Sequence, residues 1–198
     1  MIISHRHRFI FVKTRKTAGS TFEKLMLPHL GEDDICTGSS RDDTPALNIQ
    51  ADTNGHIPLK DIMSKYFPQG TNYDIITIER NPYDKVVSSY YWHQHIKPHQ
   101  FGEMSFDDYM KSCNLLPQDW ELYQPINNVK VFKYEKMDDM YMWLKKMKSV
   151  NLLDKVGQTK LKSGIRKVKD YKEMHTDTTR KIVSQLFADE IKEFRYEF

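Results

Sequence analysis

The sequence has little of several features that would mark a special class of protein. It has two cysteines in 198 residues, too few for a disulfide framework or a four-thiolate zinc site. No stretch approaches the ~18 apolar residues that cross a bilayer. The apolar run at residues 9–12 is too short for the core of a signal peptide. These absences predict a cytoplasmic protein of a reducing compartment, with no membrane as partner.

The chain also lacks a large charge of either sign. Its net charge is only +3, which does not suggest a protein that coats nucleic acid. A small excess still suits an anionic ligand where the positive charge is locally concentrated. Hydrophobic residues make up 39% and charged residues 29%, so the chain is expected to be globular rather than disordered. The length fits one domain spanning residues 1–198.

Strands and helices alternate in the predicted order of elements. Runs of β-branched and aromatic residues predict strands over 9–13, 73–78 and 129–133. Each strand is followed by apolar residues at helical spacing, which predict helices over 21–30, from Asn81 and Pro82 onward, and over about 138–147. A last helix is predicted to begin near Asp177. The polar segment 31–55 is expected to be a long loop. This alternation predicts an α/β fold with a mostly parallel sheet.

The first candidate site lies between the first predicted strand and its helix. Small residues there let backbone N–H groups approach an anion, and the helix N-terminus points its positive end at the same place. Hydroxyls and basic side chains add donors and charge. These residues are Lys13, Arg15, Lys16, Ser20 and Thr21. The combination predicts a phosphate or sulfate ligand, and the structural alternative is a basic surface turn.

The order of residues in this loop separates it from nucleotide kinases. A kinase P-loop places its lysine after the last glycine, as Gly-Lys-Ser or Gly-Lys-Thr. Here the lysine comes first, in Lys16-Thr-Ala-Gly-Ser-Thr21. No carboxylate that would bind Mg²⁺ is evident at a predicted strand end. Both features argue against a phosphoryl transferase, which stays open as the first alternative.

A second motif, Arg80-Asn-Pro-Tyr-Asp-Lys-Val-Val-Ser88, directly follows the second strand. The guanidinium of Arg80 and the hydroxyl of Ser88 are suited to bind one phosphate. Alone, the motif would be interpreted as a capped helix with a surface ion pair. Together, the two motifs resemble the nucleotide-binding signatures of the PAPS-dependent sulfotransferases. The continuation Ser88-Ser-Tyr-Tyr-Trp92 is similar to the branch of Golgi carbohydrate sulfotransferases and their bacterial and viral relatives.

This resemblance implies a P-loop-like three-layer fold with a central, mostly parallel sheet flanked by helices. It also implies PAPS as the sulfuryl donor and PAP as the product, without a metal. The first loop would hold the 5′-phosphosulfate, the Arg80 and Ser88 pair would hold the 3′-phosphate, and a late loop would close over the nucleotide. The implied nucleotide-binding residues are Arg15, Lys16, Thr17, Ala18, Gly19, Ser20, Thr21, Arg80, Ser88, Ser163 and Arg166.

Two residues are assigned to catalysis by the same resemblance. Lys16 would stabilise or protonate the leaving group, and His56, between the two motifs, would take the proton of the acceptor hydroxyl. A histidine near its ordinary pKa suits that task. The alternatives for the base are Glu23, His93 and His95. Glu23 would otherwise belong to the solvated face of the first helix.

The acceptor is not encoded in any readable motif. A carbohydrate or small-molecule hydroxyl is the expectation that the resemblance gives, with segments 31–55 and 97–123 shaping the pocket. Trp92, Trp120 and Tyr123 are candidates to stack on a sugar. A nucleotide-binding module without activity is the second alternative. The expected absence of a membrane anchor would separate the chain from the Golgi enzymes and favours a bacterial or viral origin. The sequence does not indicate an oligomeric state.

Overall fold

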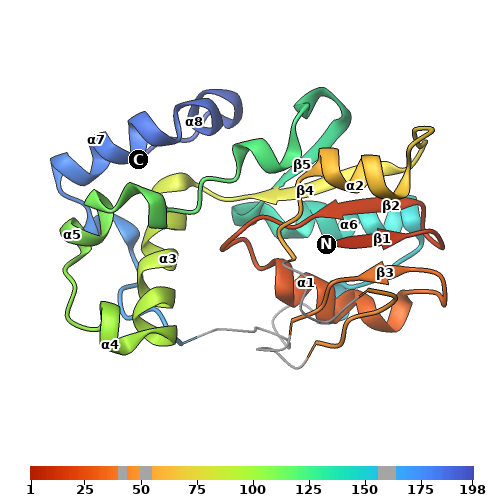
Figure 1. Ribbon diagram of the computed structural model, residues 1–198, viewed down its shortest axis with the longest axis horizontal. Helices are drawn as coiled ribbons and strands as arrows, with labels where there is room; N and C mark the ends of the chain where they lie inside the picture. The colour runs from red at the N-terminus through yellow and green to blue at the C-terminus, as the bar shows by residue number, and fades with distance from the viewer. Residues whose placement is uncertain (40–43, 50–54, 156–163) are drawn as a thin grey trace. The chain divides into compact units, whose positions relative to one another are not determined.

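We describe a computed structural model of the chain, which covers residues 1–39, 44–49, 55–155 and 164–198 (Figure 1). The chain folds into two compact units. Unit 1 comprises Met1–Glu79 and Glu121–Leu161, and unit 2 comprises Arg80–Trp120 and Lys162–Phe198. Each unit has its own hydrophobic core, and each is described separately below.

Unit 1 is built on a five-stranded sheet with the order β3-β1-β2-β4-β5. The strands are β1 (Ile2–Ser4), β2 (Phe9–Val12), β3 (Ile35–Cys36), β4 (Asp74–Glu79) and β5 (Val129–Lys133). β2 pairs in parallel with β4, and β4 pairs in parallel with β5. β1 is antiparallel to both β2 and β3, so β3 runs in the same direction as β2. Only β1 of the five is reversed, and the predicted mostly parallel sheet is confirmed.

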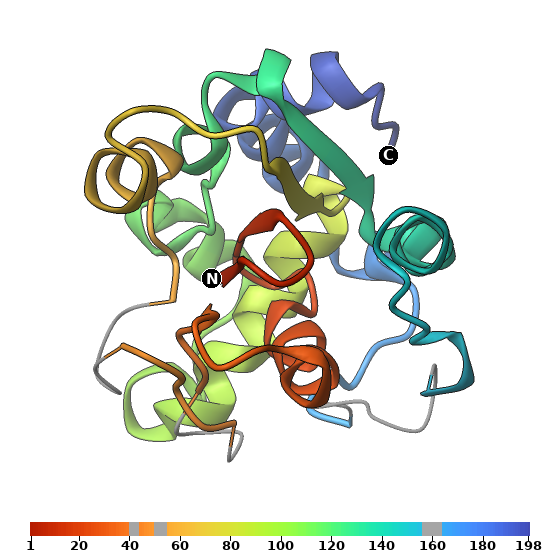
Figure 2. The ribbon, with the colours of Figure 1, turned by 90° about the vertical axis from the view of Figure 1, so that its right-hand side faces the viewer.

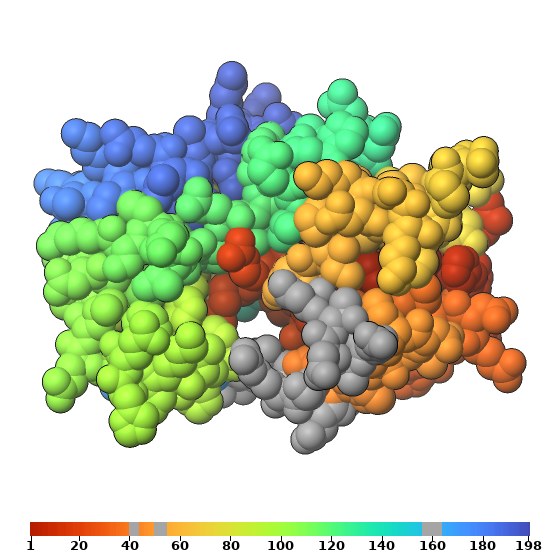
Figure 3. Space-filling view, in the orientation of Figure 1, coloured from red at the N-terminus to blue at the C-terminus, as the bar shows by residue number. Residues whose placement is uncertain are grey.

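Helices cover both faces of this sheet. They are α1 (Gly19–Met26), α2 (Leu59–Tyr66) and α6 (Met137–Lys148). α1 and α6 pack on one face, where they share a core with side chains of β2, β4 and β5. Figures 1 and 2 place α2 over the opposite face, and in the space-filling view α2 forms much of the visible surface of unit 1 (Figure 3). The arrangement is the predicted three-layer α/β fold.

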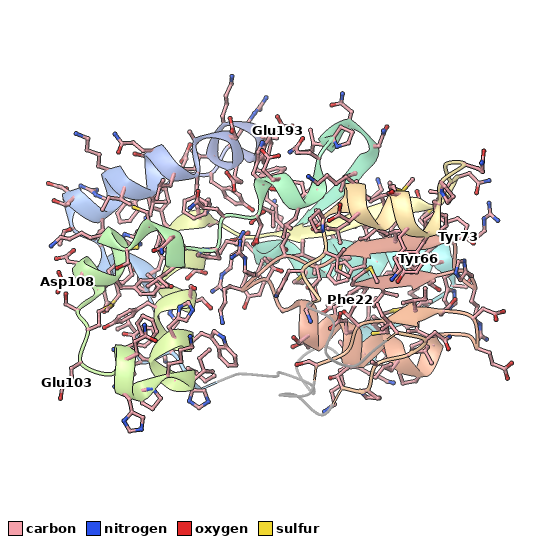
Figure 4. All side chains as sticks on the ribbon, in the orientation of Figure 1. Phe22, Tyr66, Tyr73, Glu103, Asp108 and Glu193 are labelled. Atoms are coloured by element: carbon pink, nitrogen blue, oxygen red, sulfur yellow. The ribbon has the colours of Figure 1, made fainter. Side chains whose placement is uncertain are left out.

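The core fixes where α1 begins relative to the sheet. Phe22, labelled in Figure 4, lies on α1 and meets Phe11 of β2 edge to face, with ring centroids 4.7 Å apart. Phe9, Phe11 and Phe22 are fully buried. Burial of such rings stabilises a fold by roughly 2–3 kcal/mol each. The loop before α1 is therefore held between two well-packed elements.

Unit 2 is helical in the residues that the structure describes. Its helices are α3 (Pro82–Ile96), α4 (Pro98–Phe101), α5 (Phe106–Lys111), α7 (Asp177–Leu186) and α8 (Ala188–Phe194). Asn81 caps α3, since its side chain accepts a hydrogen bond from the Tyr83 backbone at 3.1 Å. Tyrosines of α3 pack with Phe101, Phe106 and Val183 in the core of this unit. The helix start expected at Asn81 and Pro82 is confirmed.

Candidate active site

The loop between β2 and α1 has an unusual backbone. Lys16 and Ala18 adopt left-handed conformations, with φ of 62° and 63°. Each such residue other than glycine costs roughly 1–2 kcal/mol. Thr17 between them does not have a positive φ. Left-handed residues at two nearby positions of a loop can turn successive N–H groups toward one side, which suits an anion.

This strained loop is tied to the end of β4. The Thr14 hydroxyl donates to the Ile78 carbonyl and lies 2.9 Å from the Thr17 hydroxyl, which donates to the Thr14 carbonyl at 3.1 Å. Thr14 and Thr17 are almost completely buried. Thr17, a predicted nucleotide ligand, therefore uses its side chain to shape the loop. Its contribution to a ligand would come from its backbone.

The first turn of α1 is free of acidic residues. Ala18 at the N-cap has only a methyl group, and Gly19, Ser20 and Thr21 follow it. The first N–H groups of a helix have no partner within the helix, and together with the helix dipole they attract anions. Ser20 is 9% exposed and Thr21 is half-buried, so the predicted hydroxyl donors lie in this turn. Arg15 and Lys16 are half-buried in the loop before it.

Glu23, one turn further along α1, is fully buried and not part of a solvated face. Its Oε2 accepts from Lys13 Nζ at 2.5 Å. Its Oε1 accepts from the Met1 amino group at 2.6 Å and from the Thr37 hydroxyl at 2.9 Å. Burial alone would raise the pKa of Glu23, but the Met1 amino group and Lys13 outweigh it and hold the pKa below its ordinary value. A carboxylate bonded in this way is a poor proton acceptor.

His56 lies close to the same cluster. Its Nδ1 is 2.9 Å from the Lys13 carbonyl oxygen, which can only accept a hydrogen bond. Nδ1 therefore carries the proton, and in the neutral ring Nε2 is the proton acceptor. The ring is partly buried. This is the tautomer that a general base acting through Nε2 needs.

Unit 2 contains the second group of predicted ligands. Arg80 is 7% exposed, and its Nη2 lies 2.6 Å from Asp84 Oδ2. The Arg166 guanidinium contacts Asp84 Oδ1 and donates to the Lys169 carbonyl at 3.0 Å. Two predicted ligands from distant parts of the sequence thus share one carboxylate. Guanidinium groups can make charge-assisted, bidentate hydrogen bonds to a phosphate, so this pair of arginines suits an anion.

Asp84 was not among the residues expected at this site. Its signal in the sequence is its place in the first turn of the expected helix, four residues after Arg80. Ser88 is half-buried one turn beyond it. Ser163 lies outside the described residues.

The alternative bases on α3 have other surroundings. His93 Nδ1 lies 2.9 Å from the Tyr109 hydroxyl, which donates to Ser89 at 2.9 Å. The His93 ring also packs against Phe101. His95 is exposed. His93 is therefore partly buried and takes part in the packing of unit 2.

The three candidate stacking residues differ in exposure. Tyr123 is fully buried in unit 1 and donates to Glu79 at 2.9 Å. Trp120 is half-buried and meets Phe194 edge to face in unit 2. Trp92 is half-buried beside His95. Full burial removes Tyr123 from the surface that a sugar would reach.

Unit 2 has an open cavity of about 650 Å³ within the segment expected to shape the acceptor pocket. Its lining is mainly polar and includes the carboxylates of Glu103 and Asp108, both labelled in Figure 4. Lys111 and the Ser105 hydroxyl bind Asp108, and these hydrogen bonds lower its pKa. The remaining lining residues are Pro98, His99, Gln100 and Met104.

Two absences apply to the part of the chain that the structure describes. No three or more His, Cys, Asp or Glu side chains there are grouped so as to hold a metal ion. None of the helices within residues 1–39, 44–49, 55–155 and 164–198 has the length and apolar character needed to cross a membrane.

Comparisons by sequence and by structure give different results. No family model and no curated protein matches the sequence. Among solved structures, the chain is similar to mouse sulfotransferase SULT7A1 complexed with PAP, with a TM-score of 0.56 and 14% identity over 95% of this chain and 86% of that one. A sulfotransferase from Alicyclobacillus acidocaldarius aligns at a TM-score of 0.43 and 12% identity, over 96% of each chain. The first of these likenesses shows that the chain has the sulfotransferase fold.

Proposed function

We propose that this chain is a sulfotransferase that moves a sulfuryl group from PAPS to an acceptor hydroxyl. One observation carries the proposal. The loop with left-handed Lys16 and Ala18 follows a parallel strand directly and leads into a helix N-terminus that has no side-chain cap. This geometry suits a phosphate or sulfate group. The sulfotransferase fold and the lysine that precedes Gly19 support sulfuryl transfer over phosphoryl transfer.

The residues of unit 1 have separate roles in this proposal. The N–H groups of residues 17–21 and the hydroxyls of Ser20 and Thr21 bind the 5′-phosphate. Nε2 of His56 takes the proton of the acceptor hydroxyl as its oxygen bonds to sulfur. Lys16 stabilises the charge on the phosphate oxygen whose bond to sulfur breaks. The donor supplies the sulfuryl group, and in-line positioning of the two oxygens lowers the barrier further.

The residues of unit 2 are assigned to the other phosphate. Arg80, Arg166 and Ser88 bind the 3′-phosphate, and Asp84 orients the two guanidinium groups. Charge-assisted hydrogen bonds of this kind contribute roughly 1.5–3 kcal/mol each. Ser163 is assigned to the same phosphate by resemblance alone.

The acceptor belongs to the proposal only as a class. The open polar cavity beside α4 and α5 supports a hydrophilic acceptor, and a carbohydrate hydroxyl is our first choice. Acidic side chains at its edge would accept hydrogen bonds from sugar hydroxyls.

The test has a binding arm and a transfer arm. We expect PAP to raise the melting temperature in the presence of EDTA, and ATP with Mg²⁺ to raise it little or not at all. Labelled PAPS with a panel of saccharide and small-molecule acceptors should then give a labelled product. His56→Ala should abolish transfer while leaving PAP binding intact. Stabilisation by ATP with Mg²⁺ alone would contradict the proposal and favour a phosphoryl transferase.

A further inference from the structure

Lys13 and Glu23 form a buried ion pair in unit 1. Lys13 is 6% exposed, and Glu23 is fully buried. Burial lowers the pKa of the Met1 amino group to about 6, and the Glu23 carboxylate opposes this shift. Lys13 is a second cationic partner of Glu23. Burying such a pair is costly, so the pair by itself does not explain the stability of the unit, and its neighbours decide what it does.

The path of the Lys13 side chain depends on two glycines. A Cβ at Gly19 would lie 2.7 Å from Lys13 Cγ, a distance at which the lysine would have to move. A Cβ at Gly55 would lie 3.4 Å from Lys13 Cδ and 3.0 Å from the Thr37 hydroxyl. The lysine therefore runs between the first residue of α1 and the residue just before His56.

The same cluster also binds the backbone around His56. The Met1 amino group donates to the Gly55 carbonyl at 3.2 Å as well as to Glu23. The Lys13 carbonyl accepts from Nδ1 of His56 at 2.9 Å. Glu23 thus holds the side chain of Lys13, and the backbone carbonyl of Lys13 holds the imidazole of His56.

We propose that Glu23 is a positioning residue, which acts through Lys13 and the Gly55 backbone to hold His56 in the tautomer with Nε2 as proton acceptor. This inference extends the role of His56 as the general base, and that role rests on the proposed function. Glu23 does not itself take the proton, because both of its oxygens accept hydrogen bonds from buried donors.

The experiment compares Glu23→Gln with a matched control in unit 2. Lys85 and Asp119 form a second buried pair, with Nζ 2.8 Å from Oδ2 and both side chains fully buried. Asp119→Asn removes a buried carboxylate charge in the same way as Glu23→Gln. Both variants should lose stability, and only Glu23→Gln should change His56.

The decisive readout is the nitrogen NMR spectrum of the His56 ring in nucleotide-free protein, assigned with His56→Gln. Wild type and Asp119→Asn should show protonated Nδ1 and unprotonated Nε2 in the neutral ring. Glu23→Gln should show a mixture of tautomers. In transfer assays with the acceptor found in the screen, the kcat of Glu23→Gln should fall about tenfold or more, while its affinity for PAP stays within about twofold of wild type. Its pH–rate profile should shift, and that of Asp119→Asn should not.

A second pair of variants covers the case in which Glu23→Gln fails to fold. Thr37→Val removes one hydrogen bond to Oε1, and Thr37→Ser keeps the hydroxyl. The valine variant should move the His56 signal toward the mixed tautomer, and the serine variant should restore it.

The inference is overturned if His56 keeps the wild-type tautomer and pH profile in Glu23→Gln, or in Thr37→Val where the former does not fold. Absence of transfer in the wild-type protein would instead count against the proposed function. The NMR comparison needs no nucleotide and still decides the positioning role in that case.

Discussion

Among the described residues, each compact unit contains a buried lysine–carboxylate pair and part of the proposed donor site, but the pair and the site residues are related differently in the two units. In unit 1 the Lys13–Glu23 pair touches the same residues that shape the loop and hold His56. In unit 2 the Lys85–Asp119 pair is fully buried, whereas Asp84, the preceding residue, binds Arg80 and Arg166 on a less buried side of α3. Consecutive residues of a helix point in different directions. In unit 2 the Lys85–Asp119 pair therefore does not share its surroundings with Asp84 and the two arginines. A buried ion pair alone is therefore weak evidence of function, and its neighbours decide the interpretation.

The largest expected effect lies in unit 1. Lys16→Ala should lower kcat for sulfuryl transfer about 100- to 1000-fold, because it removes a charge aimed at the leaving oxygen. Lys24→Ala, which removes a lysine from the last turn of α1, is the control and should keep the wild-type rate. Transfer from labelled PAPS measures both. Equal losses in the two variants would mean that general charge, not the loop, matters.

Unit 2 should control nucleotide affinity rather than rate. Arg166→Ala should weaken PAP binding about 10- to 100-fold, since it removes a charge-assisted contact to the 3′-phosphate. Binding of 5′-AMP, which has no 3′-phosphate, should hardly change. The exposed neighbour Lys169 gives the control variant Lys169→Ala. Titration calorimetry would remove Arg166 from the site if PAP and 5′-AMP weakened equally.

The two buried pairs should have similar effects on stability. Lys85→Met and Lys13→Met should each lower the free energy of unfolding by about 3–5 kcal/mol, because each removes the lysine that pairs with a buried carboxylate. The double change Lys85→Met/Asp119→Leu should recover most of this loss. Denaturant unfolding measures all three variants. A single-variant loss below about 1 kcal/mol would show that water reaches the remaining carboxylate.

The smallest expected effect is a pH dependence in unit 2. Burial lowers the pKa of His175, whose Nε2 lies 2.9 Å from the Tyr83 carbonyl oxygen. The unfolded chain therefore binds a proton first as pH falls through about 6.5, and the folded state loses stability below that pH. His175→Gln should flatten this decline in urea unfolding between about pH 7 and 5. Exposed His95→Gln is the control, and an unchanged slope in His175→Gln would contradict the assignment.

Sequence patterns predicted the strongest elements well. β2, β4 and β5 are β-branched runs next to strong turn or cap residues, and β5 begins and ends where expected. β1 and β3 were missed because three and two residues are too short to show alternation. α2 was also missed, although Leu59, Ile62, Met63 and Tyr66 have helical spacing behind Pro58. The prediction of an α/β fold therefore rested on the strands and helices that are long enough to show a pattern in the sequence.

The candidate site was predictable only where a local motif encodes it. The loop before α1 and the segment from Arg80 to Ser88 are each a continuous stretch of sequence. The order of residues within each stretch was therefore enough to predict it as part of the site. The burial of Glu23 depends on Met1, Lys13 and Thr37, which are distant in sequence and meet only in the fold. Helical spacing therefore could not distinguish a solvated Glu23 from a buried one. The nucleotide roles of the loop residues, the base role of His56 and the single domain stay predictions.

The most direct test of the central claim is the affinity of the wild-type protein for PAP, 5′-AMP and ATP with Mg²⁺, measured by calorimetry at one salt concentration. We predict that PAP binds at least about tenfold more tightly than 5′-AMP, because one phosphate is assigned to the loop and the other to the arginines. Binding of PAP should persist in EDTA. Tighter binding of ATP with Mg²⁺ than of PAP would contradict the account.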